Sequence, residues 1–197
     1  MKVYIDGQEY TDVIGDGSAL SILNEVKRRV SEAGRVVMEI RLDDTVMDED
    51  AFASISGGGL VVYFTSRPVR ELVLESLDEA LKYIPRLTRG LEEIALHFEK
   101  NELAIGEGKL ASGAEGLDWL LQVFQKSSAL LAVDADDNDG LSELQSALID
   151  SINSLGAFHS EKKYLQMAFC IRQKLVPEIE KLSVHVQKLL DFASSIQ

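Results

Sequence analysis

The sequence predicts an α+β protein built from two modules, a small one that contains a sheet and a larger one that is helical. Through roughly the first 66 residues apolar side chains recur in steps of two, whereas from about Pro68 they recur in steps of three and four. A step of two alternates side chains across a strand, and steps of three and four place them on one face of a helix. The expected modules are therefore residues 1–66, which contain the sheet, and residues 67–197, which form a helical bundle.

The first module is expected to begin with a hairpin and a helix. Val3 and Ile5 point one way, and Asp6-Gly7 is a dipeptide that readily adopts the positive φ angles of a tight turn. Ser18 is placed as the N-cap of the helix that follows, and Gly34 is placed to end it. The predicted buried face of this helix consists of Leu20, Leu23, Val26, Val30 and Ala33.

The rest of this module is expected to form a strand, a turn, a short helix and a final strand. Residues 36–42 and 60–64 are rich in the β-branched and other apolar side chains that strands favour. Asp43-Asp44 opens a turn into residues 45–47. The acidic residues 48–50 favour the N-terminus of a short helix, because carboxylates stabilise the positive end of the helix dipole.

This order of elements over residues 1–66 resembles the ubiquitin-like β-grasp superfold. The resemblance is one of topology, and it implies a sheet that exposes a face or an edge to partner proteins. Ubiquitin-type modifiers carry their conjugating Gly-Gly at a free C-terminus. Here Ser56-Gly57-Gly58-Gly59 precedes a strand, so we expect the glycines to supply a flexible turn and we do not expect conjugation.

The second module is predicted to be an antiparallel bundle of four or five helices. Pro68 is expected in the first turn of its first helix. Pro85 lies within the same apolar pattern, and the helix is expected to kink or break there because proline lacks a backbone donor and clashes with the preceding turn. Asn101, with Gly106 and Gly108, is expected to form a connection or a frayed turn.

Three further helical segments are predicted, over residues 110–124, 141–155 and 160–193. The last is expected to be one long helix, either bent at Pro177 or packed along the whole length of the others. Its predicted inward face consists of Leu165, Ala168, Phe169, Leu175, Ile179, Leu182, Val186 and Leu189. In composition this small acidic bundle is similar to bacterial export chaperones that cradle flagellin-like subunits, which implies chaperone-like binding of a protein.

Composition excludes several classes of function. The net charge of −13 repels phosphate backbones and anionic lipid, so neither nucleic acid nor a membrane surface is an expected partner. No stretch approaches the roughly 18 apolar residues of a membrane span, and the expected location is cytoplasmic. Cys170 is the single cysteine, and its apolar neighbours indicate a buried small side chain rather than a nucleophile.

One acidic segment, residues 134–140, is the sharpest candidate for a metal site. Asp134, Asp136 and Asn138 occupy positions one, three and five of a calcium-binding loop. However, Asp139 stands where that loop requires glycine, and Gln145 stands where it requires glutamate. The favoured interpretation is a solvated connection between two helices. The sequence therefore assigns no metal site, and these three residues are only weak candidates for metal ligands.

Other catalytic patterns are missing from the sequence. His97, His159 and His185 are scattered, and the pair Glu93 and His97 is interpreted as a surface or packing feature. No Gly-x-Ser-x-Gly elbow occurs. Trp119 lies one position from the core stripe, and partial burial in the bundle is expected for it.

These observations predict a non-enzymatic, cytoplasmic protein that binds another protein as a scaffold or in a chaperone-like manner, without a cofactor. The partner is either a different protein or a second copy in a homodimer. The alternative is a small-molecule or divalent-metal sensor that uses the acidic segment 134–140.

Overall fold

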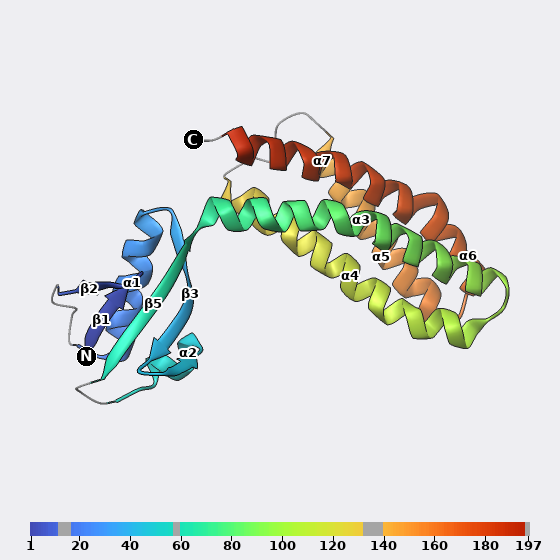
Figure 1. Ribbon diagram of the computed structural model, residues 1–197. Helices are drawn as coiled ribbons and strands as arrows, with labels where there is room; N and C mark the ends of the chain where they lie inside the picture. The colour runs from blue at the N-terminus through green and yellow to red at the C-terminus, as the bar shows by residue number, and fades with distance from the viewer. Residues whose placement is uncertain (12–16, 57–59, 132–139, 196–197) are drawn as a thin grey trace. The chain divides into compact units, whose positions relative to one another are not determined.

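The structure is a computed structural model of the 197-residue chain, and it describes residues 1–11, 17–56, 60–131 and 140–195. A sheet lies at the N-terminal end and helices follow it, which confirms the predicted α+β class (Figure 1). The chain divides into two compact units, Met1–Leu72 and Val73–Gln197. Within the described ranges, no helix is both long and apolar enough to cross a membrane.

The first unit holds a five-stranded mixed sheet in the order β2-β1-β5-β3-β4. The central pair, β1 and β5, is parallel, and the other neighbouring strands are antiparallel. The predicted hairpin is present, with Asp6 and Gly7 both at positive φ in the turn. The strands are β1 Lys2–Ile5, β2 Gln8–Tyr10, β3 Arg35–Leu42, β4 Thr45–Met47 and β5 Val61–Pro68.

Two helices of this unit, α1 (Ala19–Glu32) and α2 (Glu49–Ala53), are fixed by side-chain caps. The hydroxyl of Ser18 accepts a hydrogen bond from the backbone N–H of Ser21 at 3.2 Å, as the N-cap assignment predicted. Asp48 caps α2 in the same way, accepting from Ala51 N at 2.7 Å. Gly34 follows α1 at a φ of 66°, a conformation that costs glycine little.

The core of the first unit lies on one face of the sheet and includes residues of α1 and α2. Phe52 of α2 meets Phe64 of β5 edge to face, with ring centroids 5.5 Å apart, and both are almost wholly buried. The predicted buried face of α1 was wrong at Leu20, which is 52% exposed, and at Ala33, which is also exposed, whereas Ile22 is buried. The buried cluster consists of Val3, Ala19, Ile22, Leu23, Val26, Val30, Ile40, Phe52, Val62 and Phe64.

A polar network joins three strands where β5 ends. The carboxylate of Asp6 accepts hydrogen bonds from the backbone N–H of Ser66 at 2.7 Å and from its hydroxyl at 2.6 Å. Arg35 donates to the hydroxyl and to the carbonyl oxygen of Ser66, each at 2.8 Å. Because Ser66 is only 5% exposed, these partners replace the water that its polar atoms lose on folding.

The second unit contains most of α3 (Val69–Glu99) and all of α4 (Leu103–Leu130), α5 (Leu141–Ser160), α6 (Tyr164–Cys170) and α7 (Val176–Ser195). A π-helical turn, Ile171–Leu175, joins α6 to α7. Figure 1 shows α3 and α4 running side by side in opposite directions. The largest side chains in the core of this unit are Leu77, Ile94, Phe98, Leu120, Phe124, Leu148, Met167, Ile171, Leu175 and Ile179.

Several expectations for the helices need correction. Pro68 pairs with Arg35 as the last residue of β5, so the helix begins one residue later than predicted. Pro85 lies inside α3, which continues past it without a break. The connection between α3 and α4 is confined to residues 100–102, where Asn101 has a φ of 59°.

Gly106 and Gly108 were predicted to lie in that connection, but they belong to α4. Tertiary packing overrides the low helix propensity of glycine at the first of them. A Cβ atom at Gly106 would lie 2.5 Å from Cε1 of Phe98, whereas a Cβ at Gly108 would meet nothing within 4 Å. Gly106 therefore leaves the space into which the buried Phe98 ring packs.

The predicted last helix, residues 160–193, is interrupted by a turn near its start and contains a π turn, but it is otherwise continuous from Tyr164 to Ser195. Residues 161–163 form a turn, with Lys162 at a φ of 56°. The π turn then ends at Leu175, two residues before Pro177, and the N–H of Val176 donates to the carbonyl of Ile171, five residues back. A proline ring clashes with the carbonyl four residues before it in a regular helix, and a wider turn relieves that clash.

The π turn also explains why Leu165 and Phe169 were wrongly predicted to face inward. They are 65% and 64% exposed, although Ala168, Leu175 and Ile179 of the same predicted face are buried. A π turn contains one residue more than an α turn, which rotates the preceding helix by about 100° relative to the following one. A single 3.6-residue period extended back from α7 therefore assigns the wrong face of α6.

We predict that the Asp6 network stabilises the first unit only above acidic pH. Partial burial raises the pKa of Asp6, but the hydrogen bonds from Ser66 and the charge of Arg35 outweigh it and hold the pKa below its ordinary value of 3.8. A depressed pKa stabilises the fold above the ordinary value and loses this contribution as pH falls through the folded-state pKa. Asp6→Asn should cost about 1 kcal/mol at neutral pH, in the range for a hydrogen bond to a charged group after allowance for partial exposure.

The effect of the substitution is measured by urea unfolding of the full chain, with NMR signals of the first unit as the probe. The measurement is made at neutral pH and below about pH 3.8, the ordinary pKa of the carboxyl. The difference between wild type and Asp6→Asn should shrink in acid. A difference that stays constant with pH would contradict the role of the ionised carboxylate.

We also predict opposite effects for two glycine substitutions in α4. Gly106→Ala should destabilise the second unit by about 1–3 kcal/mol, because the buried Phe98 ring has to move. Gly108→Ala is the matched control and should stabilise the protein by up to about 1 kcal/mol, since alanine is the better helix former and the site is open. Thermal and urea unfolding monitored by circular dichroism measures both. Equal effects of the two substitutions would show that the packing of Phe98 does not depend on the absence of a Cβ at position 106.

Candidate functional site

The weak metal candidates Asp134, Asp136 and Asn138 lie outside the residues that the structure describes. Gln145, at position twelve of the same loop pattern, lies in α5. Across residues 1–11, 17–56, 60–131 and 140–195, no three His, Cys, Asp or Glu side chains gather in an arrangement that would hold a metal ion.

His97 and Cys170 each contact a neighbouring polar group. Nδ1 of His97 lies 2.6 Å from a carboxylate oxygen of Glu102, across the turn from α3 to α4, whereas Glu93 pairs with Lys109 at 2.7 Å. Glu93 and His97 form no hydrogen bond with each other, but Lys109 and, to a lesser extent, the charge of His97 lower the pKa of Glu93. Cys170 is buried, its thiol faces the carbonyl oxygen of Ser151 at 3.7 Å, and burial raises its pKa. A raised pKa keeps the thiol protonated and poorly nucleophilic.

The face of the sheet opposite the α1 core carries a row of neighbouring side chains. Tyr4 is paired with Tyr63, Tyr63 with Arg41, and Arg41 with Val46, so the row crosses four strands. The rings of Tyr4 and Tyr63 are stacked, with centroids 5.0 Å apart and planes 19° apart. The guanidinium of Arg41 lies 4.8 Å from the centre of the Tyr63 ring. We call these four residues the sheet-face row.

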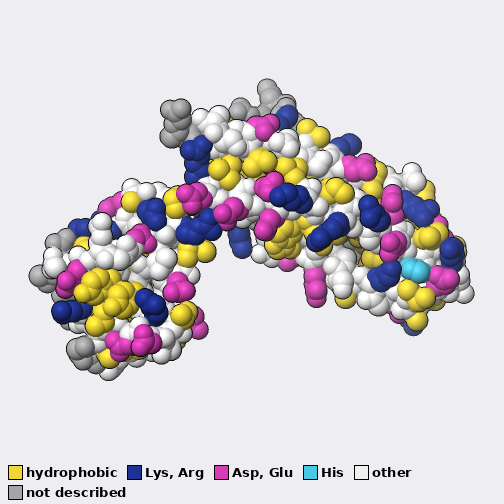
Figure 2. Space-filling view, viewed as in Figure 1, with side chains coloured by type: hydrophobic (Ala, Val, Ile, Leu, Met, Phe, Trp, Pro, Cys, Tyr) yellow, Lys and Arg dark blue, Asp and Glu magenta, His cyan; other side chains and the backbone are white. Residues whose placement is uncertain are grey.

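The side chains of the sheet-face row are exposed or partly exposed, and the charge of Arg41 in this row is not balanced by an ion pair within the described part of the chain. Val46 is 61% exposed, and both tyrosines are partly exposed. Arg41 forms no ion pair with any residue that the structure describes. Figure 2 shows hydrophobic side chains gathered on this unit, with both basic and acidic side chains at their border. Aromatic rings beside an available guanidinium are the side chains that protein interfaces favour.

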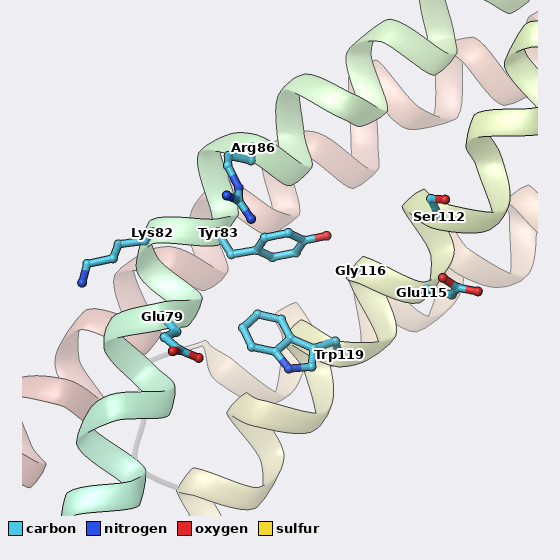
Figure 3. A pocket seen from close by; sticks show the side chains of 8 residues that line it. All are labelled: Glu79, Lys82, Tyr83, Arg86, Ser112, Glu115, Gly116 and Trp119. Carbon is cyan, nitrogen blue, oxygen red and sulfur yellow. The ribbon is translucent and has the colours of Figure 1, made fainter.

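A second exposed aromatic pair lies between α3 and α4. Tyr83 of α3 and Trp119 of α4 meet edge to face, with centroids 5.2 Å apart and planes 84° apart (Figure 3). Arg86 lies on the other side of Tyr83, with its guanidinium 5.4 Å from the ring centre. The two rings form part of an open groove of about 570 Å³. The lining residues of this α3–α4 groove are Glu79, Lys82, Tyr83, Arg86, Ser112, Glu115, Gly116 and Trp119.

Gly116 determines how Tyr83 lies. A Cβ atom at this buried glycine would overlap the phenol oxygen of Tyr83 and would lie 3.0 Å from its Cζ. The absence of a side chain therefore lets the phenol lie across the backbone of α4. Trp119, three residues further along α4, is then on the same side of the helix and 38% exposed.

Oppositely charged side chains surround these rings. Lys82 is paired with Asp78 at 2.5 Å, and this contact with the Asp78 carboxylate raises the pKa of Lys82. Glu79 and Arg86 form no ion pair with any of the residues described by the structure. Chemically, the arrangement offers two aromatic surfaces and one unpaired charge of each sign, which is suited to recognition of polar and apolar groups together.

The groove lies within the part of the chain that carries a family match. A family model described as "Domain of unknown function (DUF8042)" matches residues 75–185, which is more than half of the chain, and the chain belongs to this family. No curated protein and no solved structure matches the chain. The sheet-face row lies outside the matched residues.

The sequence analysis identified Trp119 but missed Tyr83, the other contacts of the α3–α4 groove and the sheet-face row. Trp119 was expected to be partly buried, and it packs against Tyr83 and is 38% exposed. Gly116, placed three residues before the only tryptophan, was the available signal. The register between α3 and α4 places Tyr83 opposite this glycine, and the period of a single helix does not contain that information.

We predict that Gly116→Ala displaces Tyr83 and exposes Trp119. The added methyl group would overlap the phenol, so the ring has to turn away from α4, at a cost of about 1–3 kcal/mol. Because Trp119 is the only tryptophan, its fluorescence reports on this groove alone, and its emission should shift to longer wavelength. Gly156→Ala in α5 is the control, since a Cβ there meets nothing within 4 Å. Unchanged emission and stability in Gly116→Ala would contradict the placement of Tyr83.

Proposed function

We propose that this chain is a non-enzymatic protein-binding module, and that its N-terminal sheet binds a partner protein through the sheet-face row. The observation that carries the proposal is the stacked pair Tyr4 and Tyr63 with Arg41 beside it, exposed on the face opposite the core.

The geometry of the row favours binding because its side chains are ordered in advance. Tyr63 is held between Tyr4 and Arg41, so little side-chain freedom remains to be lost when a partner arrives. Tyrosine and arginine are also enriched among the residues that contribute most to binding energy. Val46, at the end of the row, adds exposed apolar area that a partner would cover.

The strand order and the helix over one face support the resemblance to the ubiquitin-like β-grasp superfold. The order β1, β2, α1, β3, α2 and β5 is the one on which that resemblance rests, and the short strand β4 lies in addition between β3 and α2. The resemblance implies a sheet face available to partners, which agrees with the proposed role. The glycines Gly57, Gly58 and Gly59, which bear on conjugation, lie outside the described residues.

The test compares partner binding by the full-length wild type, Tyr63→Ala and Arg41→Glu. Proteins retained from a lysate of the source cells are identified, and the affinity of the purified partner is then measured by calorimetry. Each substitution should weaken binding at least about tenfold, which corresponds to roughly 1.4 kcal/mol. Phe192→Ala in α7 removes an aromatic side chain that is 45% exposed and serves as the control.

Self-association is measured in the same set of variants by light scattering after gel filtration. If the partner is a second copy, the wild type should be a dimer, and Arg41→Glu should dissociate it. A partner or a dimer that binds equally well to all variants would contradict the assignment of this face. A monomer that retains no protein would contradict the proposed function as a whole.

A further inference from the structure

We infer that the α3–α4 groove is a second docking site, and that its occupant is a partner-protein segment with a basic side chain over Trp119 and an acidic side chain against Arg86. This inference goes beyond the proposed role of the sheet, because all residues of the groove belong to the helical unit and to the matched region 75–185.

The groove has two chemically different ends. Because α3 and α4 run in opposite directions, Glu79 lies at the level of Trp119, Tyr83 at the level of Gly116, and Arg86 at the level of Ser112 (Figure 3). A carboxylate therefore accompanies the indole at one end, and a guanidinium accompanies a hydroxyl at the other. Glu79 and Arg86 are seven residues apart on α3, which corresponds to about 10 Å along the helix axis.

Trp119 offers a ring face to an incoming cation. In Figure 3 the indole is seen face on, with its edge directed at Tyr83. Tyr83 already has Arg86 on its other side. The indole is the aromatic ring that attracts cations most strongly, and a carboxylate beside it adds to that attraction. A lysine or arginine side chain of a partner would satisfy both groups at this end.

Within the described part of the chain neither Glu79 nor Arg86 is held in an ion pair, and the pKa of Lys82 is raised chiefly by Asp78 and only in last place by the charge of Glu79. Lys82 is engaged by Asp78 and extends away from the rings (Figure 3). Glu115 also points away from the rings (Figure 3). Oppositely charged side chains on a partner, separated by about the same 10 Å, would therefore pair with Glu79 and Arg86 at once.

The shape favours a segment of a protein over a small molecule. The groove holds about 570 Å³ and is open along its length, whereas pockets for small molecules enclose most of the ligand surface. One face of a helix, with charged side chains two turns apart, matches the spacing along α3. The net charge of −13 also attracts a basic segment to the Glu79 end.

The test uses two synthetic helical peptides that lack tryptophan and tyrosine and present a leucine-containing face. One carries arginine and glutamate seven residues apart on that face, and the other carries glutamine at both positions. Each is titrated into the full-length protein while Trp119 fluorescence is recorded. We expect a saturable change, with the charged peptide bound at least about tenfold more tightly, since two ion pairs at roughly 0.7–1 kcal/mol each give that factor.

Variants identify the charges responsible. Glu79→Gln and Arg86→Gln should each weaken binding of the charged peptide about fivefold, the effect of roughly 1 kcal/mol. The matched controls Glu92→Gln and Arg89→Gln remove exposed charges of α3 outside the groove and should have no effect. Tyr63→Ala should also leave the titration unchanged, which separates this site from the sheet-face row.

Three results would overturn the inference. Equal affinity for the two peptides would show that pairing of charges does not contribute to binding. Equal effects of Glu79→Gln and Glu92→Gln would place the peptide elsewhere. No change in Trp119 fluorescence with either peptide at millimolar concentration would show that the groove does not bind such a segment.

Discussion

The helical unit depends on how closely α4 approaches α3, and glycines set that distance. A Cβ at Gly106 would enter the ring of Phe98, one at Gly113 would lie 3.0 Å from Cδ1 of Ile94, and one at Gly116 would overlap Tyr83. Glycine costs a helix about 1 kcal/mol relative to alanine, and contact between large side chains and the opposite backbone offsets that cost. The buried core at Phe98 and the exposed rings of the groove are thus two results of one constraint.

The same chemical unit occurs on both candidate surfaces. Tyr63 and Tyr83 each contact a second aromatic ring, at 5.0 and 5.2 Å, and each contacts an arginine guanidinium, at 4.8 and 5.4 Å. In a chain with 33 acidic and 20 basic residues, carboxylates outnumber the cations that could pair with them. A guanidinium that rests on a ring instead keeps its hydrogen-bond donors available for carboxylates of another molecule.

Local signals in the sequence were sufficient for the cap and the hairpin of the first unit, and non-local ones were needed for the packing of the helices in the second. Ser18 and the Asp6-Gly7 turn act through neighbouring backbone atoms, so their residue types predict the cap and the hairpin directly. Gly106 was misplaced because its packing partner Phe98 comes from another helix. Of the groove, only Trp119 was recognised, because the register of α3 against α4 brings in the other side chains and single-helix periodicity does not specify register.

Because of the π turn, the side of α6 that is exposed depends on the number of residues between α6 and α7 as well as on the types of its side chains. The extra residue of the π turn directs Leu165 and Phe169 toward solvent while the contacts of α7 stay as they are. Loss of one residue between Cys170 and Val176 would restore regular α-helical phase and would rotate the outward side of α6 toward the core without any change of side-chain type. Evolution of this segment can therefore alter the exposed surface of α6 through the deletion or insertion of a single codon. Substitutions alone would need several steps to reach the same result.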